Sequence, residues 1–219
     1  MNSTNLPLAV LWDMDGTLID SEPYWLASES EFAMAHGSNW DQDDGLGVIG
    51  MSLYESSKLL KARVGSPLEP QEIIDQVTDG VLQRLEKSIP WRPGARELLK
   101  LLRENDVKTA LVTGSMHRMA KKVADQIGFD AFDVIVGGDD VAKGKPHPES
   151  YLKAAEILGV DPTKCVAFED SLTGITAAEA AGTKAVGIAH IVEIPSIEGR
   201  ILWRTLENVT MDDLRALFR

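Results

Sequence analysis

Two carboxylates follow a short apolar run near the start of the chain and could carry out acid–base or metal chemistry. Residues 8–12 are apolar, and Asp13, Asp15 and Gly16 lie just beyond them. Because side chains alternate along an extended strand, Asp13 and Asp15 are expected to face the same way, while Gly16 permits a sharp turn. Carboxylates this close repel each other, and the usual compensations are a hard cation, a shared proton or a part in catalysis. An Asp-Gly turn at the end of a strand is the structural alternative.

Further short apolar runs predict the strands that would position such a site. With the first run they predict strands at 8–12, 107–112, 133–136, 164–168 and 184–188. Between and after the later runs, helical patterns begin near Pro93, span 116–127, 148–158 and 175–181, and follow Thr210. Strands that alternate with single helices predict a parallel sheet with helices on both faces, which is a Rossmann-like α/β core.

One long stretch, residues 20–90, breaks this alternation. It predicts helices at 22–35, 52–64 and 70–87 and no strand. An insertion of this length is too long for a crossover between neighbouring strands. We therefore expect a core formed by residues 1–19 and 91–219, with a small all-α domain, residues 20–90, inserted after the first strand.

Composition narrows the classes of function. The chain has 219 residues, 44% of them hydrophobic, which suffices for a full core. Its net charge of −12 argues against binding to nucleic acid or to an anionic membrane. It has no apolar run of about 18 residues that would span a membrane, its first residues do not resemble a secretory signal, and its single cysteine, Cys165, lies in an apolar run. We expect a cytoplasmic monomer.

Polar groups follow the other predicted strands at the points where they end. Thr113 and Gly114 follow the second strand, Lys145 lies in a Gly-Lys-Pro stretch after the third, and Glu169 and Asp170 follow the fourth. Each alone could be a helix cap, a surface charge or an acidic turn. Since ligands bind at the carboxyl ends of parallel strands, the set together predicts one site for an anion and a metal.

These stretches, in this order, resemble the signature motifs of the haloacid dehalogenase superfamily. The first is residues 13–17, and Thr113, Lys145 and the pair Glu169-Asp170 correspond to the other three. The helical insertion resembles the cap of the β-phosphoglucomutase-like subfamily, so the resemblance extends over essentially the whole chain. It implies a Mg²⁺-dependent phosphomonoesterase or phosphomutase that acts on a small phosphorylated metabolite.

The resemblance assigns a role to each position. Asp13 would be the nucleophile that accepts the phosphoryl group, and Asp15 the general acid to the leaving alkoxide and then the base to water. Lys145 would neutralise charge, while Thr113 and the Gly114 amide would hold the nonbridging phosphate oxygens.

The same resemblance places Mg²⁺ beside these groups. Asp13, the main-chain carbonyl of Asp15 and Asp170 would supply oxygen ligands, with Glu169 as a further candidate.

Two alternatives to a phosphatase remain. Mutases of this subfamily carry a cap arginine and a histidine soon after the first motif, whereas residues 47–52 contain no basic residue and residues 20–23 no histidine. These departures favour a phosphatase for small sugar or polyol phosphates over a phosphomutase. A non-catalytic relative that binds phosphometabolites would be indicated by loss of Asp13 or Asp15, and both are present.

The inserted domain would select the leaving group. Its candidate substrate contacts are Glu22, Trp25, Gly50 and Met51. Among the histidines, His117 and His147 lie beside the predicted site loops and could contact substrate, whereas His36 and His190 read as ordinary surface or loop residues.

Overall fold

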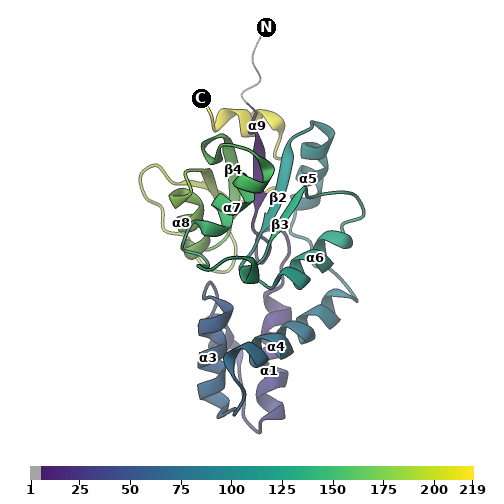
Figure 1. Cartoon of the computed structure of the whole chain (residues 1–219), viewed down its shortest axis with the longest axis vertical. Coiled ribbons are helices and arrows are strands. Elements are labelled where there is room, and N and C mark those ends of the chain that lie inside the picture. Colours follow the sequence, from purple (N-terminus) through teal and green to yellow (C-terminus); the bar gives the residue numbers. More distant parts are fainter. Residues whose placement is uncertain (1–5) are drawn as a thin grey trace. The chain divides into compact units, whose positions relative to one another are not determined.

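The computed structural model describes residues 6–219. The chain divides into two compact units. One consists of the chain up to Ile19 together with Trp91–Arg219, and the other is Asp20–Pro90 (Figure 1). Within the described residues, no helix is both long and apolar enough to cross a membrane.

The larger unit is built on one sheet in which every pair of neighbouring strands is parallel. Its strands are β1 (Ala9–Trp12), β2 (Lys108–Val112), β3 (Val134–Val136), β4 (Cys165–Glu169), β5 (Lys184–Ile188) and β6 (Ile201–Trp203). Across the sheet the order is β3-β2-β1-β4-β5-β6, so β1 lies between β2 and β4. The direction of the strand order reverses between β1 and β4, and ligands bind beyond the carboxyl ends of strands at such a reversal.

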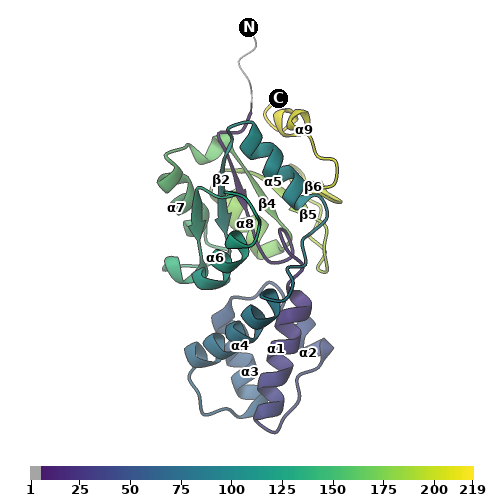
Figure 2. The same ribbon diagram turned by 90° about the vertical axis from the view of Figure 1, so that its right-hand side faces the viewer.

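Helices cover both faces of this sheet. They are α5 (Ala95–Glu104), α6 (His117–Asp125), α7 (Glu149–Leu158) and α8 (Leu172–Ala180), and a further helix, α9 (Met211–Ala216), follows β6. Figure 2 shows α5 and α7 on opposite sides of the strands. Right-handed crossovers produce this arrangement, because a reversal in strand order moves the connecting helix to the other face. The predicted fold class is therefore confirmed.

Burial explains why the central strands are apolar. All four residues of β1 are buried, as expected for a central parallel strand covered on both faces. Trp12 and Phe168, from the paired strands β1 and β4, meet edge to face with ring centroids 4.9 Å apart. These contacts fix the adjacent ends of β1 and β4, which carry Asp13 and Glu169.

Most elements of the larger unit lie within one or two residues of the sequence prediction, and the main differences are strand β6 and the start of helix α8. Strand β6 was not predicted, because it has only three residues and none of them is fully buried. Helix α8 begins at Leu172 rather than at Ile175, because Ser171 is its N-cap and accepts a hydrogen bond from the Gly174 amide at 3.0 Å.

The smaller unit contains only helices. They are α1 (Glu22–Ala35), α2 (Gln42–Leu46), α3 (Leu53–Val64) and α4 (Pro70–Leu85). Helix α4 packs against α1 and α3, and their shared core includes Phe32, Leu60, Ile73, Val77 and Val81. The three long helices follow the sequence prediction. Helix α2 was not predicted, because it is a five-residue helix rich in acidic residues and capped by Asp41.

A carboxyl group is buried in this helical unit. Glu29 of α1 is 8% exposed, and its Oε2 accepts a hydrogen bond from Trp40 Nε1 at 2.8 Å. Burial raises the pKa of Glu29 from 4.5 to about 7, although the Trp40 hydrogen bond opposes the shift. The fold therefore favours the protonated carboxyl over the carboxylate.

Replacing Glu29 with glutamine should stabilise the protein at alkaline pH. Because the pKa of the folded state is the higher one, wild-type stability falls as pH rises from 4.5 to about 7. We expect Glu29→Gln to exceed the wild type by about 1–3 kcal/mol at about pH 8 and to match it at about pH 4.5. Urea unfolding at both pH values measures the difference, and a gain of equal size at both would contradict the burial argument.

Candidate active site

Lys145 links two buried carboxylates at the carboxyl edge of the sheet. Its Nζ lies 2.6 Å from Asp13 Oδ1 and 2.6 Å from Glu169 Oε1. The same nitrogen donates a hydrogen bond to the main-chain oxygen of Val112 at 3.0 Å, at the end of β2. Three strand ends therefore meet around one ammonium group.

The sheet and one loop place these groups. Asp13 directly follows β1, and its amide donates to the main-chain oxygen of Phe168 at 3.0 Å, which keeps it beside the last residue of β4, Glu169. Lys145 comes from the loop between β3 and α7. That loop is held by Glu149, whose carboxylate accepts hydrogen bonds from the Ala142 and Lys143 amides at 2.7 and 3.1 Å.

Burial and like charge shape the electrostatics of the site. Burial and the charge of Glu169 raise the pKa of Asp13 from 3.8 to about 7, against the opposing effect of Lys145. Burial disfavours the charged form of Lys145, but the charges of Asp13 and Glu169 outweigh it and raise the pKa of Lys145 above its ordinary value. The ammonium therefore stays charged between the two carboxylates.

Three carboxylates at this edge could hold a metal ion. Ligand atoms of Asp13, Glu169 and Asp170 all lie within 4.8 Å of one another, and all three residues are buried. Among the described residues, Asp13 Oδ2 and Glu169 Oε2 are buried oxygens with no hydrogen-bond partner. Buried carboxylate oxygens without donors are the ligands that a hard divalent cation prefers. The residues present thus fit such a cation.

Two glycines make room for these carboxylates. A Cβ at Gly174 would lie 1.9 Å from Glu169 Oε2, and a Cβ at Gly16 would lie 1.9 Å from Asp170 Oδ2. Gly16 also has a φ of +81°, a conformation that side chains other than glycine rarely adopt. Both positions therefore require glycine while the acidic pair keeps its place.

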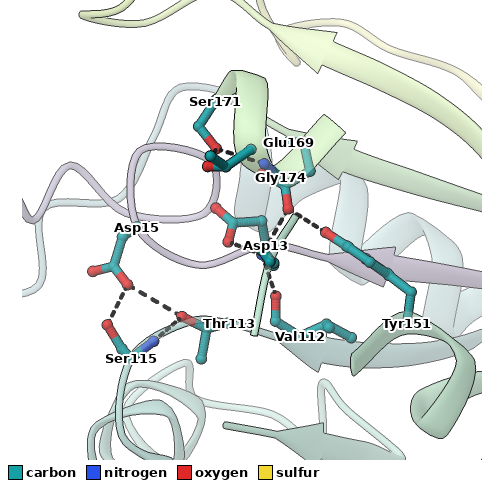
Figure 3. Close-up of polar contacts among 11 residues, drawn as sticks. Asp13, Asp15, Val112, Thr113, Ser115, Tyr151, Glu169, Ser171 and Gly174 are labelled. Carbon is teal, nitrogen blue, oxygen red and sulfur yellow. Dashed lines mark hydrogen bonds and ion pairs between the residues drawn. The ribbon is translucent and has the colours of Figure 1, made fainter. Parts of the chain in front are cut away.

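Asp15 lies against the predicted phosphate-binding loop. Its Oδ2 accepts hydrogen bonds from Ser115 Oγ at 2.6 Å and from Thr113 Oγ1 at 3.2 Å (Figure 3). The Ser115 amide donates in turn to Thr113 Oγ1 at 3.0 Å. Next to them, apart from Gly114 and its two chain neighbours, no described residue has an atom within 4 Å of the point where a Cβ of Gly114 would stand, so the main chain is open there.

The structure brings together the core site residues that the sequence predicts, and it adds others that sequence reasoning missed. Ser115 contacts Asp15, and a hydroxyl so soon after Thr113 was a usable signal for it. The Tyr151 hydroxyl donates to Glu169 Oε1, but in sequence Tyr151 looks like any apolar helix residue. Burial and the charges of nearby carboxylates raise the pKa of Tyr151 well above its ordinary value, so this phenol stays protonated.

Three of the histidines lie in or beside the loops of the site, and a substrate contact of His117 or His147 stays a prediction. His190 lies in the loop after β5, as the sequence predicts, and its ring stands beside the first motif, because its Cδ2 is 2.9 Å from where a Cβ of Gly16 would stand. His117 contacts Asp140 through Nδ1 at 2.5 Å. His147 Nδ1 accepts a hydrogen bond from the Glu149 amide at 3.3 Å and so stabilises its own loop.

The four substrate contacts predicted from the insertion all lie in the helical unit. Glu22 is the first residue of α1, and Trp25 is a buried residue of the same helix. Gly50 and Met51 lie in the turn before α3. Their contact with a substrate stays a prediction.

The parallel sheet with helices on both faces places this protein in the α/β class, and comparison with known proteins shows the family to which it belongs. Residues 7–182 match the family model described as haloacid dehalogenase-like hydrolase. The chain belongs to this family, so the predicted family and the prediction of an enzyme are confirmed.

Individual relatives agree with this assignment. Hexitol phosphatase B of Escherichia coli is 33% identical over 190 residues, which cover 85% of this chain and 85% of that protein. Beta-phosphoglucomutase of Bacillus subtilis is 31% identical over 190 residues and 83% of each chain. The solved structure of CbbY from Rhodobacter sphaeroides in complex with phosphate matches with a TM-score of 0.83 at 26% identity, covering 93% of this chain and 96% of that one.

Replacing Lys145 with methionine should destabilise the protein, and more so at alkaline pH. The variant would leave the charges of Asp13 and Glu169 buried without a partner, which costs about 3–5 kcal/mol. At about pH 5 the loss should shrink, because protonation of a carboxyl removes part of the repulsion. Urea unfolding at about pH 8 and about pH 5 measures both values.

The exposed neighbour Lys143 supplies the matched control. Lys143→Met should leave the free energy of unfolding nearly unchanged at both pH values. If Lys145→Met behaved in the same way, the ion pairs would contribute nothing to the fold and the electrostatic account would be wrong.

Proposed function

We propose that this protein is a Mg²⁺-dependent phosphomonoesterase that acts on a small sugar or polyol phosphate through an aspartyl-phosphate intermediate. The observation that carries the proposal is the placement of Asp13. Its carboxylate is buried at the end of β1, lies 2.6 Å from Lys145 Nζ, and belongs to the acidic cluster. The name of the similar hexitol phosphatase B supports the substrate class.

In the first step, a carboxylate oxygen of Asp13 attacks phosphorus. The bond between phosphorus and the ester oxygen breaks, and Asp15 gives its proton to the leaving alkoxide. The products are the free alcohol and a phosphoryl group on Asp13. Asp15 suits this role because it lies two residues beyond Asp13 and is held at the phosphate-binding loop by Ser115 and Thr113.

In the second step, a water molecule attacks phosphorus and Asp15 takes its proton. The bond between phosphorus and the Asp13 oxygen breaks, so inorganic phosphate leaves and the Asp13 carboxylate is restored. This division replaces one difficult displacement with two easier ones.

The surrounding residues stabilise the negative charge of the phosphoryl group and would hold the metal ion. Lys145 faces Asp13 and neutralises part of the charge on the transferring group, while Thr113 and the open main chain at Gly114 hold its nonbridging oxygens. Asp13, Glu169 and Asp170, with the main-chain carbonyl of Asp15, would hold Mg²⁺. When bound, Mg²⁺ supplies positive charge that allows an anionic nucleophile to approach an anionic ester.

The helical unit would act as the cap that selects the leaving group. A cap that closes over a site leaves a small chamber and keeps water away between turnovers, which favours small metabolites. Glu22, Trp25, Gly50 and Met51 are the residues of this unit that we propose as substrate contacts. The acidic net charge of the chain, −12, makes nucleic acid an unsuitable partner. We further propose that the enzyme works as a monomer in the cytoplasm.

A phosphomutase of the β-phosphoglucomutase type is the second candidate, because the B. subtilis mutase is 31% identical. A mutase must hold the second phosphate of a bisphosphate intermediate. The turn between α2 and α3, where its relatives carry a cap arginine, contains no basic residue over 47–52. This difference favours hydrolysis over mutase activity.

Phosphate release from a panel of sugar and polyol phosphates tests the proposal. We expect inorganic phosphate to appear with Mg²⁺ and not with EDTA, because the acidic cluster needs a cation to bind a phosphate ester. The panel should include β-glucose 1-phosphate with a bisphosphate primer. Its conversion to the 6-phosphate without net release of phosphate would identify a mutase instead.

Asp13→Asn serves as the control for this assay. The variant should lower the rate of phosphate release by more than about 10³-fold, because an amide is a poor nucleophile. Circular dichroism should show an unchanged fold, since Asp13 lies beyond the end of β1 and outside the apolar core. Turnover at the wild-type rate would rule out the covalent mechanism.

A further inference from the structure

The two oxygens of the Glu169 carboxylate have different surroundings. Oε1 lies 2.6 Å from Lys145 Nζ and also accepts a hydrogen bond from the Tyr151 hydroxyl (Figure 3). Oε2 is buried and has no hydrogen-bond partner within residues 6–219. One oxygen is therefore saturated by donors from the protein, and the other is left for a ligand.

Tyr151 holds this arrangement from the side of α7. Its side chain is fully buried, and Lys145 Nζ lies 5.2 Å from the centre of its ring. The phenol thus contacts both members of the ion pair, through its hydroxyl and through its ring face. A buried hydroxyl is unfavourable unless it is hydrogen-bonded, so a phenylalanine would fill this core position at less cost if packing were the only requirement.

The opposite side of the carboxylate is closed by α8. A Cβ at Gly174 would lie 1.9 Å from Oε2 and 2.3 Å from Oε1 of Glu169, so the helix main chain bounds the space that the carboxylate can occupy. Rotation that moved both oxygens away from the hydroxyl would break the Tyr151 hydrogen bond inside the protein, where no water replaces it. The orientation of Glu169 is therefore set from two helices.

We propose that Tyr151 is a positioning residue for the divalent cation: its hydroxyl fixes the Glu169 carboxylate so that Oε2 faces the metal together with Asp13 and Asp170. This inference rests on the proposed function for the presence of the cation. Helix α7, which carries Tyr151, lies outside the four signature stretches, and the inference gives it a part in metal affinity.

Direct metal binding by Tyr151→Phe tests the proposal. The variant keeps the ring and removes only the hydroxyl. Binding of Mn²⁺ is measured without substrate from the electron paramagnetic resonance signal of the free ion, and binding of Mg²⁺ by competition. We expect both dissociation constants to rise about tenfold, as for other residues that orient a metal ligand.

The matched control is Tyr54→Phe. Tyr54 is 56% exposed in the helical unit, and the same chemical change there should leave the metal dissociation constants unchanged. A second control is the double-mutant cycle with Glu169→Gln. If Tyr151 acts through Glu169, adding Tyr151→Phe to Glu169→Gln should change metal affinity less than twofold, or about the error of the measurement.

Steady-state kinetics separates positioning from a general structural role. At saturating Mg²⁺ the kcat of Tyr151→Phe should return close to the wild-type value, with an unchanged KM for the phosphate ester. An unchanged metal dissociation constant in Tyr151→Phe would overturn the inference, and so would a kcat that stays low at every Mg²⁺ concentration. Because metal binding is read without substrate, a protein that binds metal but releases no phosphate would contradict the proposed function alone.

Discussion

Lys145 places one positive charge between the carboxylates of Asp13 and Glu169, in a part of the sheet that excludes most water. Two carboxylates brought together there without a cation would each lose hydration and repel the other. The pairing of β1 with β4 creates this repulsion, because it sets Asp13 beside the end of β4. The loop after β3 places Lys145 at the same edge, where its positive charge offsets this repulsion. The strand order and this loop therefore depend on each other.

Negative charges outnumber positive charges at the site, and this excess connects the fold to its chemistry. One ammonium faces a cluster of three buried carboxylates, Asp13, Glu169 and Asp170. A divalent cation would cancel this excess of negative charge and so allow a phosphate ester to approach the site. This neutralisation must be local, because the net charge of the whole chain, −12, repels anions. Metal and substrate binding are therefore expected to be coupled.

Local apolar and helical patterns in the sequence predicted most of the strands and helices. The topology of a parallel sheet predicted that the four signature stretches lie together at the carboxyl ends of the strands. Strand β6 escaped prediction, because three partly exposed residues give no periodic signal. Ser115, Tyr151, Gly174 and His190 escaped for another reason. Their roles come from contacts between distant parts of the chain, such as that between Ser115 and Asp15, so each looks alone like a cap, a core residue or a loop residue.

Chemical trapping of the phosphorylated enzyme tests the central claim most directly. Borohydride added during turnover reduces an aspartyl phosphate to homoserine, and peptide mass spectrometry locates the changed residue. We expect homoserine at position 13 in the wild-type protein, formed only in the presence of a phosphate ester and Mg²⁺. Continued release of phosphate with no change at position 13, or a modified residue elsewhere, would contradict it.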